Sequence, residues 1–176
     1  MIPYRVKQVL WALTARPLPS SDLKLLSELL SPAEQELFKQ FSVNDQNHSI
    51  RVVRLLISQG HTHASLQKAA VLHDIGKTRV DRLSVIDRSV AVALKYLLPS
   101  RARQWGTLDL KDAKRYQVPA IVEAQHARWG ADMVLEIGVD DLTVSLIRRH
   151  QDKLPAGLNS EEDSLLVKLQ AADNVS

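Results

Sequence analysis

Four histidines and two aspartates occur where they could bind a metal ion. The chain has six histidines among 176 residues and no cysteine, so a bound metal would need imidazole or carboxylate ligands. Asp74 directly follows one of these histidines, and Asp173 comes four residues after Leu169. The six side chains share a position on or beside the apolar face of a predicted helix: His48, His73, Asp74, His126, His150 and Asp173.

Inward-facing imidazole and carboxylate groups are costly to bury unless a partner compensates them. A single buried histidine is usually satisfied by a backbone carbonyl and has a purely structural role. A group of this size is explained more simply by a shared metal site, and the interior of a helical bundle is a common place for one. Neutral imidazole and carboxylate suit Fe, Mn, Co, Ni or Zn. The residues therefore favour a metal centre, with separate structural roles as the alternative.

The elements that position these residues are predicted to be helices, because helix start and stop signals are frequent and strand signals are nearly absent. In chain order, the sequence predicts a helix that begins at Ser31 with Pro32 and Glu34 in a capping box, one capped by Asn44 or Asp45 that ends at Gly60, and one from about Ser65 to His73. The next helix begins near Ser84 and Asp87 and ends near Pro99, and another runs from Pro119 to Gly138. A helix capped by Asp140 or Asp141 ends near His150, and the last one is capped by Ser160.

The sequence thus predicts an all-α fold, a compact bundle of about nine helices. It contains no internal repeat and no long linker, so residues 1–176 are expected to form a single domain. The apolar stretch from Val9 to Leu13 is followed by Pro17 and Pro19, and we interpret it as a first helix. No segment reaches the roughly 18 apolar residues that span a bilayer. We therefore expect a cytoplasmic protein with no membrane span.

Composition excludes several classes of function. The absence of cysteine rules out a disulfide scaffold, a Cys nucleophile and a thiolate zinc finger. Only 5% of the residues are aromatic and the net charge is +3, so we expect no nucleic-acid polymer as partner. From Lys77 to Tyr116 there are ten Lys or Arg residues against four Asp. This basic segment is either a solvated surface or a rim for an anionic ligand.

Residues His73 to Lys77 read HDIGK, which resembles the signature of the HD-domain metal-dependent phosphohydrolases. The chain also has the supporting residues in the order of that superfamily, with His48 before the signature and His126, His150 and Asp173 after it. His126 to Gly130 further resembles the H-x-x-x-G element of its binuclear members. The resemblance implies an HD phosphohydrolase core over residues 45–176 and leaves residues 1–44 as an N-terminal helical extension.

The resemblance also implies a role for each residue of the set. His48, His73, Asp74 and Asp173 would bind a first divalent transition-metal ion, and Asp74 would bridge to a second ion on His126 and His150. Fe or Mn is expected at both positions, with Co, Ni, Zn or Mg as alternatives. A metal-bridging hydroxide would be the nucleophile. Asp74 and Lys77 would be the catalytic residues, because Lys77 lies one turn past His73 and could reach a phosphate oxygen.

The implied substrate is a small phosphorylated compound of nucleotide type, cleaved at a phosphate ester or anhydride bond. Arg79, Arg82 and Arg128 are further substrate-binding candidates, each with a solvent-exposed role as the alternative. The Gly-Tyr-Pro motif of the cyclic-di-GMP phosphodiesterases is missing after His150, where the chain reads Gln151-Asp152-Lys153. Two other functions share these ligands: an HD-fold di-iron oxygenase, and a non-catalytic nucleotide-binding regulatory module.

Overall fold

The computed structural model describes residues 16–80, 85–154 and 160–176. These residues form nine α-helices and three short 3₁₀ helices, and none of them forms a strand. The elements are α2 (Ser20–Leu29), α3 (Pro32–Phe38), α4 (Val43–Ser58), α5 (Ala64–Leu72), η1 (Ile75–Arg79), α6 (Val85–Leu97), α7 (Pro99–Gly106), η2 (Leu110–Asp112), η3 (Arg115–Gln117), α8 (Val118–Glu136), α9 (Asp141–Arg149) and α10 (Glu161–Asp173). The predicted all-α fold is confirmed. The expected helix at Val9–Leu13, the start signal at Ser84 and Arg82 lie outside the described residues.

Local capping explains where several helices begin. Ser31 and Glu34 form the predicted capping box at the start of α3, with each side chain bonded to the other residue's backbone N–H. Asp140 and Ser160 cap α9 and α10 as predicted. The predicted helix α4 is present, but its predicted cap at Asn44 or Asp45 was wrong: the cap is Ser42, whose hydroxyl accepts from the Asp45 N–H at 3.2 Å. The cap therefore lies two residues before Asn44, and the helix begins at Val43.

Two helices begin at or directly after a proline, and neither start was predicted from the sequence. α2 begins after Pro19 with no side-chain cap. α7 begins at Pro99, the residue expected to end the preceding helix. Pro99 can both end α6 and begin α7, because proline lacks the N–H that would continue a helix and its fixed φ suits the first helical position. None of the described helices is long and apolar enough to cross a membrane.

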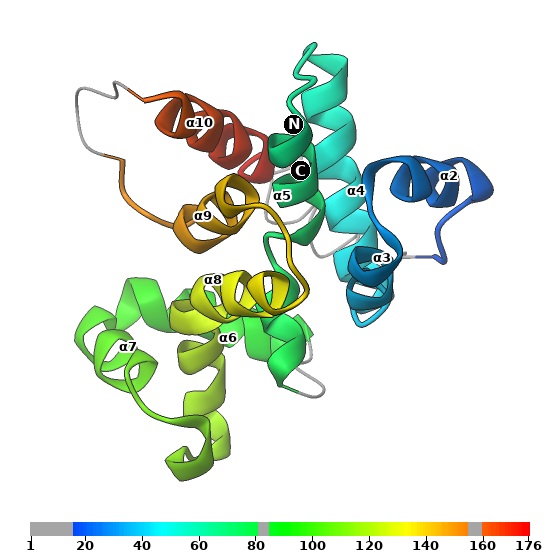
Figure 1. The fold of residues 1–176 in the computed structure, drawn as a ribbon. Coiled ribbons are helices and arrows are strands. Elements are labelled where there is room, and N and C mark those ends of the chain that lie inside the picture. The colour runs from blue at the N-terminus through cyan, green and yellow to red at the C-terminus, as the bar shows by residue number, and fades with distance from the viewer. Residues whose placement is uncertain (1–15, 81–84, 155–159) are drawn as a thin grey trace, which may run out of the picture.

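Helices α2, α4, α9 and α10 pack around α5, whose residues Leu66 and Ala69 to Leu72 are all buried. Figure 1 shows α4 and α5 side by side, with α2 and α3 on one side, α9 and α10 on the other, and α6 and α7 beyond α8. Leu26 of α2 and Leu37 of α3 belong to the same core as α5. A smaller apolar cluster around Ile121 and Trp129 lies on another face of α8. α8 therefore contacts both cores and packs against α9 and η1, the 3₁₀ helix that follows α5.

Two glycines allow the backbone after α5 to cross α8 at contact distance. A Cβ added at Gly76 would lie 2.0 Å from the His126 carbonyl oxygen and 2.6 Å from the Gly130 nitrogen. A Cβ added at Gly130 would lie 3.1 Å from the Gly76 nitrogen. This crossing places Asp74, two residues before Gly76, beside His126 on α8. Gly76 of the HDIGK segment and Gly130 of the segment that begins at His126 thus allow the close packing that brings Asp74 and His126 together.

Candidate metal centre

The six side chains singled out from the sequence lie together in the structure. Four of them come from helix ends: His73 follows α5, Asp74 precedes η1, His150 follows α9, and Asp173 is the last residue of α10. His48 and His126 come from within α4 and α8. At helix ends the chain changes direction, so side chains of separate helices can meet at one point. Two sets of these residues have the mutual distances of a metal site: His48, His73 and Asp74, and Asp74, His126 and His150.

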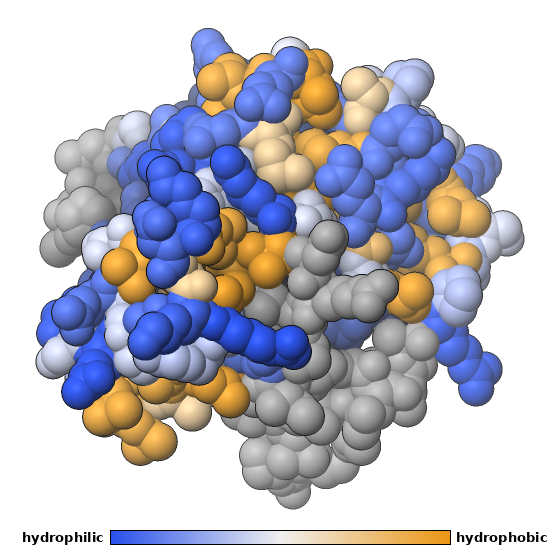
Figure 2. Space-filling model, turned by 90° about the horizontal axis from the view of Figure 1, so that it is seen from below, coloured by the Kyte–Doolittle hydropathy of each residue, from blue (hydrophilic) through white to orange (hydrophobic). Residues whose placement is uncertain are grey.

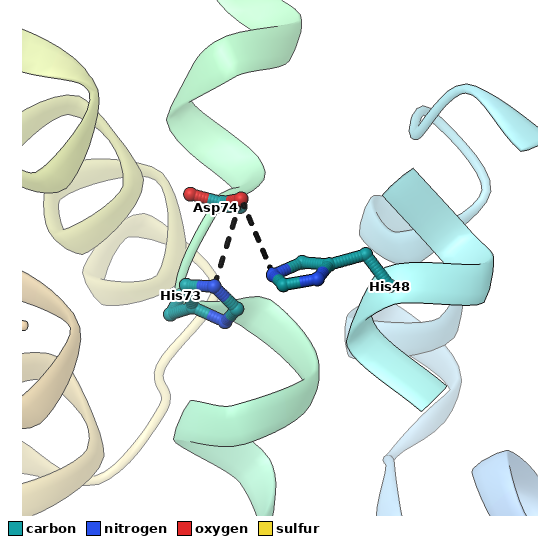
Figure 3. Close-up of side chains that lie close together, drawn as sticks. All are labelled: His48, His73 and Asp74. Carbon is teal, nitrogen blue, oxygen red and sulfur yellow. Dashed lines mark ion pairs between the residues drawn. The ribbon is translucent and has the colours of Figure 1, made fainter. Parts of the chain in front are cut away.

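Asp74 belongs to both sets because its two carboxylate oxygens face in different directions. Oδ2 lies 3.6 Å from His73 Nε2 and 4.0 Å from His48 Nε2. Figure 3 shows both of these rings directed at the carboxylate. Oδ1 lies 3.3 Å from His126 Nε2 and 3.8 Å from His150 Nε2. We name the first side, with His48, His73 and Asp173, the outer half, and the side with His126 and His150 the inner half.

Asp173 completes the outer half from the end of α10. Its Oδ1 accepts a hydrogen bond from His48 Nε2 at 2.9 Å and lies 3.4 Å from His73 Nε2. The outer half is also the accessible one: 16% of the His48 side chain and 32% of the Asp173 side chain are exposed, whereas His73 and His126 are fully buried. The cluster is therefore open to solvent on the side of His48 and Asp173.

Backbone carbonyls set the orientation of three of the four rings. His73 Nδ1 donates to the Ala70 carbonyl at 3.0 Å, His126 Nδ1 to Val122 at 2.8 Å, and His150 Nδ1 to Ile147 at 2.7 Å. A carbonyl can only accept, so Nδ1 carries the hydrogen in each ring. In the neutral ring, Nε2 then presents a lone pair to the cluster. This arrangement is typical of histidines that bind metal ions.

Two features of the cluster fit a cation and are costly without one. His73 Nε2 is buried and makes no hydrogen bond with the residues that the structure describes, although Asp173 Oδ1 lies 3.4 Å away. His126 Nε2 and His150 Nε2 lie 3.2 Å apart. When both rings are neutral, two lone pairs face each other there and repel. A cation in each half would remove these costs, and four imidazoles with two carboxylates are a suitable ligand set for divalent transition metals. The residues present therefore fit the metal ions that the sequence implies.

Both carboxylates of the cluster are ionised. Burial alone would raise the pKa of Asp74, but Lys77, His73 and His126 outweigh it and hold that pKa well below its ordinary value. Burial of Asp173 is likewise outweighed by His73 and His48, which lower its pKa. The cluster therefore offers two negative charges in a largely buried space, and this attracts cations.

The histidines differ from one another in proton affinity. Burial disfavours the charged form of His73, but Asp74 and Asp173 outweigh burial and raise its pKa to about 9. For His150, burial acts together with repulsion from His73 and His126 and lowers the pKa to about 3. His150 is therefore neutral at pH 7, whereas His73 is positively charged when no metal ion is bound.

Lys77 lies against the cluster. Its Nζ is 2.5 Å from Asp74 Oδ2, and a quarter of its side chain is exposed. The ammonium group thus stands at the accessible edge, beside the outer half. A lysine here can neutralise the carboxylate and can also meet an anion that enters from solvent.

The structure does not bring Arg79 or Arg128 into the cluster. Arg79 is exposed and its guanidinium lies 5.4 Å from the centre of the Trp129 ring. Arg128 is exposed and donates to Gln125 on its own helix at 2.7 Å. Figure 2, viewed from the side where α6 and α7 lie, shows hydrophilic side chains over much of that face. Lys95 and Lys111 of the basic segment are exposed and form ion pairs with Glu123 and Asp109, as in a solvated surface.

Sequence reasoning missed one polar residue that reaches the cluster's backbone. Gln170 on α10 donates to the carbonyl of His150 at 3.0 Å. Its only sequence signal is its place three residues before Asp173, on the same helix face. That signal is weak, because glutamine is common on the exposed faces of helices.

Comparison with known proteins supports the fold and the cluster together. The family model described as HD domain matches residues 46–176. The match covers well over half of the chain and includes all six residues of the cluster. A search of the curated proteins found no match, and a search of the solved structures found none.

Proposed function

The chain belongs to the HD-domain family, and we propose that it is a metal-dependent phosphohydrolase. It cleaves a phosphate ester or anhydride bond of a small, nucleotide-like substrate. The observation that carries the proposal is the carboxylate of Asp74, which faces two histidines with each of its oxygens. Such an arrangement suits a carboxylate that bridges two metal ions.

The ligands divide between the two halves of the cluster. His48, His73, Asp173 and Asp74 Oδ2 would hold one ion, and His126, His150 and Asp74 Oδ1 would hold the other. We propose Fe or Mn, because imidazole and carboxylate ligands together suit these metals. When bound, two such cations supply a hydroxide nucleophile near neutral pH and neutralise phosphoryl oxygens.

The protein's own contribution is to bind and orient the phosphate. The substrate enters on the side of His48 and Asp173, because these are the accessible members of the cluster. Lys77 stands at the same edge and would contact a non-bridging phosphate oxygen there. A positive group aimed at an oxygen that gains charge lowers the reaction barrier. Lys77 therefore acts in catalysis without serving as a metal ligand.

The test combines metal analysis with a substrate panel. Protein purified without oxygen or chelator is expected to contain about two transition-metal ions per chain. With Mn²⁺ or Fe²⁺ present, it is expected to release phosphate or a nucleotide product from at least one member of a panel of nucleotides and simple phosphate esters. Two bound ions with oxygen consumption and no hydrolysis would indicate the oxygenase instead. Nucleotide binding with no turnover across the panel would indicate the regulatory module.

A further inference from the structure

The end of α9 is held by a side chain from another helix. The last carbonyls of a helix have no partner within it and must find one elsewhere. His150 follows the last residue of α9, and Gln170 Nε2 donates to its carbonyl at 3.0 Å and to that of Asp152 at 2.9 Å. A carboxamide nitrogen has two hydrogens, so both are used. The contact fixes the backbone on each side of residue 151.

The same face of α10 also reaches the outer half of the cluster. Gln170 and Asp173 are three residues apart, and residues with this spacing lie on one side of a helix. Asp173 contacts His48 at 2.9 Å, and Gln170 contacts the backbone that carries His150. Neighbouring positions on one helix are thus joined to both halves of the cluster.

The orientation of His150 alone does not set the distance between the two halves. Its ring is fixed by the hydrogen bond from Nδ1 to the Ile147 carbonyl, but Ile147 belongs to the same helix as the ring. The position of the ring relative to Asp173 therefore depends on contacts between α9 and α10. Gln170 makes the contact that lies at His150 itself.

A second contact between α9 and α10 is made by charged side chains and provides a control. Arg149 donates to Asp163 at 2.7 Å and also pairs with Glu162, which accepts from Ser145 Oγ at 2.7 Å. Glu162 is in the first turn of α10, and eight residues of helix, about 12 Å, separate it from Gln170. This contact joins the two helices without touching the carbonyl of His150.

We propose that Gln170 is a positioning residue that holds His150 in place for the inner half of the metal centre. It holds His150 of the inner half in register with Asp173 of the outer half, so that both ions can be bound at once. The inference rests on the metal centre of the proposed function. It assigns no contact between Gln170 and substrate.

The experiment is a calorimetric titration of metal-free full-length protein with Mn²⁺. Wild type is expected to bind two ions, and Gln170→Leu is expected to bind the inner ion about 10- to 100-fold more weakly with the outer ion unchanged, as for other residues that orient a ligand. Gln170→Glu keeps the size of the side chain but loses both donors, so it is expected to weaken the inner ion in the same way. It serves as the test if the leucine variant does not fold. Glu162→Gln is the control and should lower thermal stability with both affinities unchanged.

Double variants identify which ion is affected. In a His150→Ala background the inner half is already disabled, so adding Gln170→Leu should change the remaining affinity little. In a His48→Ala background, Gln170→Leu should produce its full effect on the ion that remains.

Unchanged affinities in folded Gln170→Leu and Gln170→Glu would overturn this positioning role while leaving the proposed function intact. Equal weakening of both ions in Gln170→Leu and Glu162→Gln would also overturn it, since the residue would then only stabilise the fold. A wild-type protein that binds no metal ion would overturn both this inference and the proposed function.

Discussion

Asp74 is the residue on which both halves of the cluster depend, because each of its oxygens faces a different pair of histidines. Asp74→Ala removes both oxygens, so we expect the loss of both metal ions and of nearly all hydrolysis. Metal content by mass spectrometry and product release measure these effects. Asp132→Ala is a suitable control, because 45% of the Asp132 side chain is exposed and its ion pair in the described part of the chain is with Arg148. Retention of two ions and ordinary turnover in Asp74→Ala would contradict the site.

Lys77 separates metal binding from phosphate stabilisation. We expect Lys77→Ala to keep both ions and to lower kcat/KM by about 100- to 1,000-fold, the usual loss when one stabilising group is removed from a transition state. Steady-state kinetics and metal analysis of the same preparation test this. Lys111→Ala, at an exposed position of the same basic segment, should behave as wild type. Loss of metal from Lys77→Ala would instead give Lys77 a structural role at Asp74.

At the scale of elements, the crossing of η1 over α8 positions Asp74 beside His126. A Cβ at Gly76 would overlap the His126 carbonyl oxygen, 2.0 Å away. We expect Gly76→Ala to lower the free energy of unfolding by about 3 kcal/mol, at the upper end for overpacking, because backbone must move. Gly60 has a positive φ of 80° and open space around its Cβ position, so Gly60→Ala should cost only about 1 kcal/mol. Urea denaturation compares the two, and equal losses would argue against the close crossing.

The start of α9 gives an element-scale prediction with a pH dependence. Burial raises the pKa of Asp140, but hydrogen bonds from the Thr143 N–H, the Thr143 hydroxyl and the Ser65 hydroxyl outweigh it and lower that pKa below 3.8. We expect Asp140→Ala to lower stability by about 1 kcal/mol. Asp141→Ala, at the next, exposed position, should cost less.

Because the folded-state pKa of Asp140 is depressed, the ionic part of this stabilisation is present above pH 3.8 and is lost as the pH falls through the folded value. The stability difference between wild type and Asp140→Ala should therefore shrink in acid. Chemical denaturation at a series of pH values measures it. A difference that grows as the pH falls below 3.8 would contradict the assignment of the cap.

At the scale of the whole molecule, the cluster joins five α-helices that are far apart in the sequence: α4, α5, α8, α9 and α10. Ions that bind only the folded state stabilise it by about 2.7 kcal/mol when present at 100 times their Kd. For a chain of this size, that corresponds to a rise in Tm of roughly 5 to 10 °C. We expect a chelator to lower Tm by this amount and added Mn²⁺ to restore it. Asp74→Ala should show no such response, and an unchanged Tm after verified metal removal would contradict buried ligation.

The sequence predicted the helices well where their start signals are local. Capping boxes and proline positions act within about four residues, so Ser31, Asp140 and Ser160 identified the starts of α3, α9 and α10. The cap of α4 was assigned wrongly because Ser42, Asn44 and Asp45 are all good capping residues within one turn. α2 was not predicted because it has no side-chain cap at all.

By itself, the sequence determined an all-α chain with four histidines and two aspartates on inward faces, because residue type and helical period are properties of neighbouring residues. Only the tertiary structure decided that Asp74 presents Oδ2 to the outer half and Oδ1 to the inner half. It also decided that the backbone at Gly76 packs against the backbone at Gly130, and that Gln170 caps the end of α9. The contact from His48 to Asp173 spans 125 positions and that from Gln170 to His150 spans 20. Such contacts depend on how whole helices pack, and no local pattern specifies that packing.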